Sequence, residues 1–87
     1  MREIVVDTRE FEPPAPMQMV LSELQSMLPG ESFVHQIHRM EPTMLFNRLK
    51  PMGIEFVVDK RGDEYHIYYF YPEDREKIRE IIDVPGT

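Results

Sequence analysis

The sequence contains no cysteine. Disulfides, thiolate chemistry and cysteine-based zinc sites are therefore excluded. Long apolar runs are also missing, since none approaches the length of about 20 residues that a membrane-spanning helix needs. The N-terminal segment holds no continuous apolar stretch of the kind found in secretion signals. We therefore expect a cytoplasmic protein that is not bound to a membrane.

Positive charge is scarce as well. The chain has 10 Lys and Arg residues against 16 Asp and Glu residues, which gives a net charge of −6 at pH 7. Phosphate backbones and anionic lipid surfaces repel such a chain, so we expect no nucleic-acid or membrane partner. The 87 residues predict one small domain, residues 1–87. A domain of this size buries only about 60–65% of its extended-chain surface, so its stability is expected to be modest without a partner.

Apolar periodicity predicts four strands and three helices. The strands are expected at residues 4–6, 32–38, 54–59 and 64–71, and the helices at about 16–28, 42–50 and 73–83. Pro51 lacks the N–H that would continue the second helix, so this helix is expected to end or kink near Lys50. Arg61, Gly62 and Asp63 lie between two alternating strands and predict the tip of a hairpin.

The fourth predicted strand is apolar on both faces. One face carries Tyr65, Ile67, Tyr69 and Tyr71, and the other carries His66, Tyr68 and Phe70. This pattern is typical of a strand inside a sheet with both sides covered. Right-handed crossovers make the first three strands parallel, and the hairpin makes the fourth antiparallel. In the second strand, we expect Phe33 and Ile37 to face the helices.

A motif follows the first strand. Asp7 and Arg9 come directly after it, and Pro14 and Pro16 precede the first helix. This spacing resembles the opening of the TusA/SirA-like sulfur-carrier fold, in which a strand, Asp-x-Arg-Gly and two residues lead into Cys-Pro-x-Pro. The resemblance covers about residues 3–71. It implies an α/β (α+β) two-layer sandwich, built as β-α-β-α-β-β with a mixed four-stranded sheet of order 1-2-4-3, to which this chain adds a C-terminal helix.

Two positions depart from that family pattern. Pro13 stands where the family has its persulfide-carrying cysteine, and Glu10 stands where it has a glycine. The chain therefore resembles a cysteine-less branch of domains of unknown function, and we expect no sulfur transfer, no enzyme activity and no cofactor. That branch often accompanies redox and denitrification proteins, which implies an accessory role. If the glycine conformation is retained, Glu10 is expected to be strained by about 1 kcal/mol.

Charged residues predict a shallow polar edge near the start of the first helix. The residues expected there are Arg9, Glu12, His38, Arg39 and Glu41. Because the edge mixes charges and offers no nucleophile, it favours recognition over catalysis. Arg9 could hold an anion beside the helix N-terminus, or the pair of Asp7 and Arg9 could brace the loop. We favour bracing, because the prolines remove donors that an anion would use.

The histidines offer an alternative function. His35 and His38 are three apart on a strand and point to opposite faces, so they are not expected to share a metal. His38 and His66 could meet across neighbouring strands, beside a carboxylate, and form a zinc or iron site. With Arg9, they would define a metal-binding or small-molecule-binding domain. Histidines on strands are more often half-exposed residues without a metal. The seven methionines, likewise, suit the filling of gaps in a core more than the binding of copper.

The sheet face opposite the two main helices needs a cover. If His66, Tyr68 and Phe70 lie on it, they expose an aromatic patch that monomers rarely carry. We expect a homodimer or a protein partner centred on Tyr68 and Phe70. The other candidate cover is the C-terminal helix, through Ile78, Ile81 and Ile82.

Overall fold

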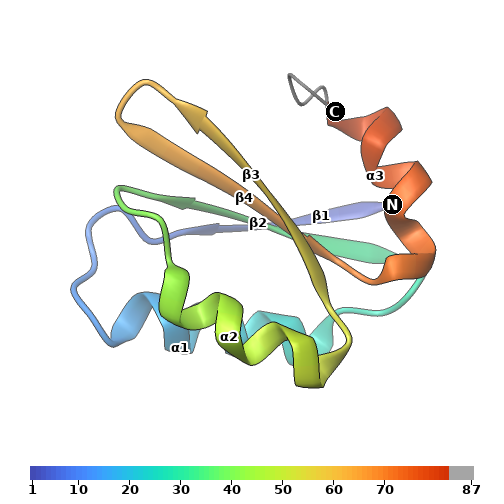
Figure 1. The fold of residues 1–87 in the computed structure, drawn as a ribbon, viewed down its shortest axis with the longest axis horizontal. Helices are drawn as coiled ribbons and strands as arrows, with labels where there is room; N and C mark the ends of the chain where they lie inside the picture. The colour runs from blue at the N-terminus through green and yellow to red at the C-terminus, as the bar shows by residue number, and fades with distance from the viewer. Residues whose placement is uncertain (83–87) are drawn as a thin grey trace.

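A mixed four-stranded sheet forms the centre of the fold (Figure 1). A computed structural model of the chain describes residues 1–82. In chain order the elements are β1 (Arg2–Asp7), α1 (Ala15–Ser26), β2 (Ser32–His38), α2 (Thr43–Met52), β3 (Glu55–Arg61), β4 (Glu64–Phe70), a 3-10 turn at Pro72–Asp74 and α3 (Arg75–Ile81). No helix within residues 1–82 is long and apolar enough to cross a membrane.

The strand order is β1-β2-β4-β3, as predicted. β1 pairs with β2 in parallel, while β4 pairs antiparallel with both β2 and β3. The central position of β4 is also confirmed. Its residues from His66 to Phe70 are all buried, because helices cover parts of both faces of the sheet.

Two helix boundaries differ from their prediction. α1 ends at Ser26, so Leu28 is 54% exposed and does not belong to its buried face. α2 continues through Pro51 and ends at Met52. Proline is tolerated there because it removes a hydrogen bond only from the last turn. Gly53 then adopts a left-handed conformation with φ 70°, which ends the helix.

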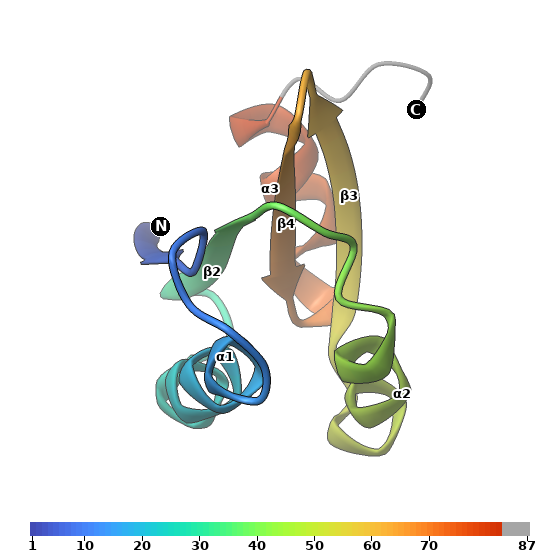
Figure 2. The same cartoon turned by 90° about the vertical axis from the view of Figure 1, so that its left-hand side faces the viewer.

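α1 and α2 lie side by side on one face of the sheet, and α3 lies on the other (Figures 1 and 2). The residues buried beneath α1 and α2 are Val6, Val20, Leu24, Met27, Val34, Leu45, Leu49, Ile54, Ile67 and Tyr69. The predicted orientation of β2 is therefore wrong. Val34 faces these helices, whereas Phe33 packs on the α3 side. Because side chains alternate along a strand, the error reverses every residue of β2.

A buried polar chain crosses this core. The Tyr69 hydroxyl donates to Gln36 Oε1 at 2.7 Å, and Gln36 Nε2 donates to Thr8 Oγ1 at 3.0 Å. The Thr8 hydroxyl in turn donates to the main-chain oxygen of Ile37 at 3.1 Å. All three side chains are fully buried. This row of hydrogen-bonded side chains thereby joins β4 and β2 to the loop that follows β1.

α3 covers an apolar half of the opposite sheet face. Ile78 and Ile82 pack there on Phe33, Tyr68 and Phe70. Tyr68 is only 3% exposed and Phe70 only 2%, so the expected exposed aromatic patch is absent from the described residues. The C-terminal helix, the other cover considered from the sequence, occupies this surface. It is held in place at the 3-10 turn, where the buried Asp74 carboxylate accepts the Gly30 N–H at 2.9 Å.

Candidate functional site

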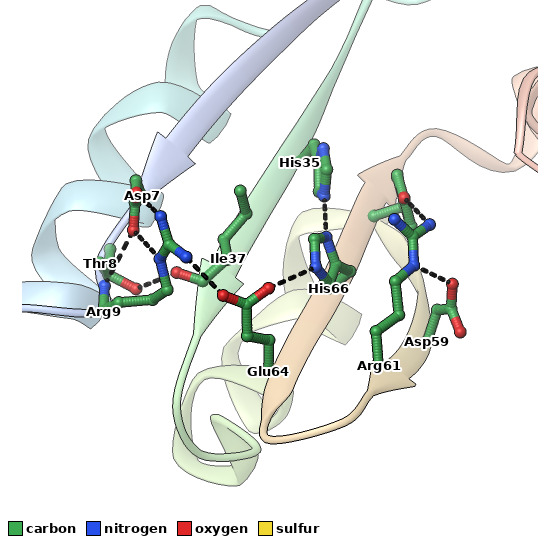
Figure 3. A network of polar contacts seen from close by, with 10 residues as sticks. Asp7, Thr8, Arg9, His35, Ile37, Asp59, Arg61, Glu64 and His66 are labelled. Atoms are coloured by element: carbon green, nitrogen blue, oxygen red, sulfur yellow. Dashed lines mark hydrogen bonds and ion pairs between the residues drawn. The ribbon is translucent and has the colours of Figure 1, made fainter.

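The half of this sheet face beyond α3 carries a network of charged and polar side chains (Figure 3). It draws on all four strands and on the loop after β1. Its members are Glu3, Asp7, Arg9, His35, Asp59, Arg61, Glu64, His66 and Tyr68. The face is therefore divided into an apolar part under α3 and a polar part, which we call the polar face.

Arg9 closes one end of the polar face. Its guanidinium holds both oxygens of Asp7, with Nε–Oδ1 at 2.9 Å and Nη2–Oδ2 at 2.7 Å, and its Nη1 donates to Glu64. The side-chain hydrogen bond from Arg9 lowers the pKa of Asp7 to about 2. The same two carboxylates raise the pKa of Arg9. Arg9 thus ties the loop to β1 and β4, which matches the bracing alternative and not the anion site.

Two histidines lie at the centre of the polar face. His35 Nε2 lies 2.8 Å from His66 Nδ1, and each ring turns its other nitrogen toward a carboxylate. His35 Nδ1 is 2.9 Å from Glu3, and His66 Nε2 is 3.3 Å from Glu64. The two imidazoles are buried, whereas both glutamates are about half-exposed. Burial lowers the pKa of His35, and Glu3 opposes that shift only in part.

Arg61 and Tyr68 connect the polar face to the apolar part. Arg61 pairs with Asp59 at 2.7 Å and donates to the Tyr68 hydroxyl at 3.0 Å. The ring of Tyr68 stacks on His35, with centroids 4.4 Å apart and an interplanar angle of 18°. Burial raises the pKa of Tyr68. The Arg-Gly-Asp string of the sequence is thus confirmed as a hairpin tip, and its arginine is engaged within the sheet.

The residues predicted to form one polar edge do not lie together in the structure. Arg39 lies 3.4 Å from Glu12 with both side chains largely exposed, and Glu41 is exposed where the chain approaches α2. Arg9 finds its partners on the polar face instead. His38 is buried on the opposite side of β2, where its Nδ1 lies 3.1 Å from the main-chain oxygen of Thr8. A carbonyl oxygen only accepts, so this nitrogen carries a hydrogen and is not available to a metal.

The predicted pairing of His38 with His66 is wrong, because these residues lie on opposite faces of the sheet. His66 meets His35 instead. Alternation along each strand separates its side chains into two sets, one for each face of the sheet. The sequence does not show which set of β2 shares a face with His66 of β4, because it does not give the register between the two strands. Within residues 1–82, no group of three or more His, Asp or Glu residues is arranged to hold a metal ion.

A second feature lies at the outer edge of β3. A groove of about 540 Å³ runs between α2 and α3 beside this edge strand. It is lined by Phe46, Leu49, Lys50, Gly53, Ile54, Glu55, Phe56, Val57, Phe70, Pro72, Arg75, Ile78, Arg79 and Ile82. The groove is mainly apolar with a basic rim, although the chain as a whole is acidic.

These features define a small α/β sandwich with a polar sheet face at one end and an apolar groove at its open edge. The family described as "Uncharacterized conserved protein (DUF2249)" matches residues 5–69, and the chain belongs to this family. The match begins within β1, ends within β4 and leaves out α3. Comparisons with curated proteins and with solved structures give no match.

Proposed function

We propose that this protein is a non-catalytic interaction module that binds an extended, acidic segment of a partner protein along β3. The observation that carries the proposal is the position of the groove beside an unpaired strand edge. β3 pairs only with β4 among the described strands, so alternate backbone N–H and C=O groups face outward. Such an edge accepts an added strand through main-chain hydrogen bonds.

Aromatic side chains give this edge an apolar anchor. The rings of Phe46 and Phe56 stack with centroids 3.8 Å apart and an interplanar angle of 12°. Phe56 remains 39% exposed despite this contact. A segment lying along β3 would cover Phe56 and place every second side chain toward the groove. Burial of an exposed aromatic ring is a common source of binding energy at protein interfaces.

Charge selects the kind of segment. The rim of the groove carries Lys50, Arg75 and Arg79 against a single acidic residue, Glu55. Glu55 is already paired with Arg75, whose Nε donates to it at 2.9 Å. Lys50 lies exposed on the α2 side of the groove, and Arg79 lies exposed on the α3 side, 3.8 Å from the exposed Glu76. They favour a partner segment with acidic side chains, and this attraction should weaken as salt screens it.

The family resemblance supports the biological setting of the proposal. The Asp-x-Arg and Pro-x-Pro positions resemble those of the TusA/SirA-like fold, in its cysteine-less branch. That resemblance supports an accessory role beside redox or denitrification proteins in the cytoplasm, without sulfur-carrier chemistry. A second copy of the chain is a less suitable partner for the groove, because its net charge of −6 opposes self-association.

Selection from a displayed library of random peptides tests this function. We expect selected peptides to be rich in Asp and Glu around an apolar residue, and to shift the backbone amide signals of β3 in NMR spectra. Phe56→Ser and Lys50→Glu should each weaken binding at least about tenfold, as expected for loss of an anchor or a charge reversal. Met44→Ser is the matched control, because Met44 is 76% exposed on α2 outside the groove. Peptides that bind Phe56→Ser as well as wild type, or that shift β1 instead, would contradict the proposal.

A further inference from the structure

The groove beside β3 already holds one carboxylate. Glu55 of β3 turns its side chain to the α3 side of the sheet, because it lies opposite Phe70 of β4, which packs beneath α3. Arg75 of α3 meets it there. The Arg75 Nε donates to Glu55 Oε2 at 2.9 Å, and its Nη2 donates to Oε1. The two side chains therefore form a bidentate ion pair within the lining of the groove.

The surroundings of Glu55 suit a carboxylate that can be exchanged. The hydrogen bonds from Arg75 lower the pKa of Glu55, and the positive charge of Arg79 adds to this effect. A carboxylate is thus held in a positive environment on an acidic chain. Both members of the pair keep contact with water, since the Arg75 side chain is 50% exposed and that of Glu55 is 32% exposed. An ion pair this exposed contributes little to stability, so another carboxylate can replace Glu55.

We propose that Arg75 binds a carboxylate of the partner segment, and that Glu55 occupies this position in the free protein and is displaced when the segment binds. This inference rests on the function proposed above. A strand added to β3 places one side chain beside Glu55 on the α3 side of the sheet. Like charges directly opposite on neighbouring strands are destabilising, so an acidic residue binds there only when Glu55 releases Arg75. Glu55 therefore lowers the affinity of the groove for acidic segments.

The alternation of β3 gives the place of this carboxylate in the partner. Phe56 follows Glu55 and faces the α2 side, where it stacks on Phe46 and lies opposite Tyr69. In an added strand, the residue that covers Phe56 and the residue that reaches Arg75 point to opposite faces. Residues with that property are adjacent in sequence. We therefore expect an acidic residue directly beside the apolar residue that covers Phe56.

Peptide binding to Glu55→Gln tests the displacement. Random peptides are selected by display on wild type and on Glu55→Gln, and the affinity of each selected peptide for both proteins is measured by calorimetry. We expect Glu55→Gln to bind acidic peptides at least about threefold more tightly, because it removes both the competing carboxylate and its repulsion. The gain should vanish for peptides in which the acidic residue beside the anchor is replaced by its amide. Glu12→Gln is the matched control, because Glu12 also pairs with an exposed arginine, Arg39, outside the groove.

Arg75→Gln and a crystal structure of the complex complete the test. Arg75→Gln should weaken the binding of acidic peptides and leave the binding of their amide versions unchanged. Circular dichroism verifies that each variant folds. In the complex, we expect the peptide carboxylate on Arg75 and Glu55 turned away from it. Equal gains in Glu55→Gln and Glu12→Gln would assign the effect to net charge and overturn the inference.

The outcomes separate this inference from the proposed function. Acidic peptides that bind wild type and Glu55→Gln equally well, or a complex in which Glu55 stays on Arg75, would overturn the displacement and leave the proposed function intact. Acidic peptides that bind only Glu55→Gln would support the displacement and contradict the proposed function of the wild type. Selection of no acidic peptide by either protein would overturn both.

Discussion

Removal of one hydroxyl group from the core tests how the polar chain under α1 and α2 stabilises the fold. Tyr69→Phe keeps the ring, which is fully buried, and deletes only the donor that lies 2.7 Å from Gln36 Oε1. Burial raises the pKa of Tyr69, so its phenol remains protonated and donates at any pH used in the assay. The change leaves a buried amide oxygen without a donor.

An unsatisfied buried acceptor costs about 1–3 kcal/mol, and we expect Tyr69→Phe to lower the free energy of unfolding by that amount. Urea denaturation followed by far-UV circular dichroism measures it, with an unchanged m-value as the sign of an unaltered unfolded state. Tyr71→Phe is the matched control. The Tyr71 hydroxyl donates over 3.3 Å to the main-chain oxygen of Met27 in a half-buried position, where water can replace it.

A double-mutant cycle with Gln36→Leu isolates the interaction. Each single change leaves one buried partner without its hydrogen bond, whereas the double change removes both partners. The loss in the free energy of unfolding of the double variant should therefore be smaller than the sum of the two single losses by about 0.5–3 kcal/mol. A Tyr69→Phe loss below about 0.5 kcal/mol, or strictly additive costs, would refute the claim that this hydrogen bond is a structural requirement of the core.

The full strand order came from the resemblance to the TusA/SirA-like fold, whereas the strand directions and the inner position of β4 were predictable from the residues. Right-handed crossovers and a tight hairpin fix the strand directions, and a strand that is apolar on both faces belongs inside the sheet. The hairpin at Gly62, where φ is 61°, follows from local turn chemistry. These features depend on residues close in sequence or on general rules of connection, so they can be read without knowledge of the packing.

The orientation of β2 was not predictable, and the histidine pair depends on it. One face of β2 carries Phe33, His35 and Ile37, and the other carries Val34, Gln36 and His38. Hydrophobicity therefore favours the face of Phe33 and Ile37 for the side of α1 and α2, which is the wrong choice. The orientation of β2 depends on α3, because this helix covers Phe33 with apolar side chains on the second face of the sheet. The family resemblance did not include this helix, and the sequence offered it only as one of two candidate covers for that face.

The loop after β1 was misjudged for a related reason. The comparison with a family glycine suggested a strained Glu10, yet no residue other than glycine has a positive φ within residues 1–82. The loop is instead anchored by Thr8, a buried residue that sequence patterns did not single out. A threonine beside a charged motif resembles an ordinary loop residue, because its importance comes from Gln36, which is distant in sequence.

Three further predictions address the loop, the polar face and α3. Glu10→Gly should lower the free energy of unfolding by about 0.4–1 kcal/mol, because glycine adds freedom to the unfolded chain and relieves no strain; stabilisation in urea melts would contradict this. The Asp7 carboxyl, with its pKa lowered to about 2 from 3.8, should contribute stability above pH 3.8 that is lost as the pH falls through 2, and Arg9→Gln should return its NMR titration midpoint toward 3.8. Ile78→Ala, at a position only 1% exposed on the buried face of α3, should lower the free energy of unfolding by about 2–5 kcal/mol. Because it loosens the cover of the aromatic residues Tyr68 and Phe70, it should also increase self-association in light scattering. The same change at Ile81, which is 49% exposed on the same helix, should do neither. Equal effects of the two changes would show that α3 is not the cover of this face.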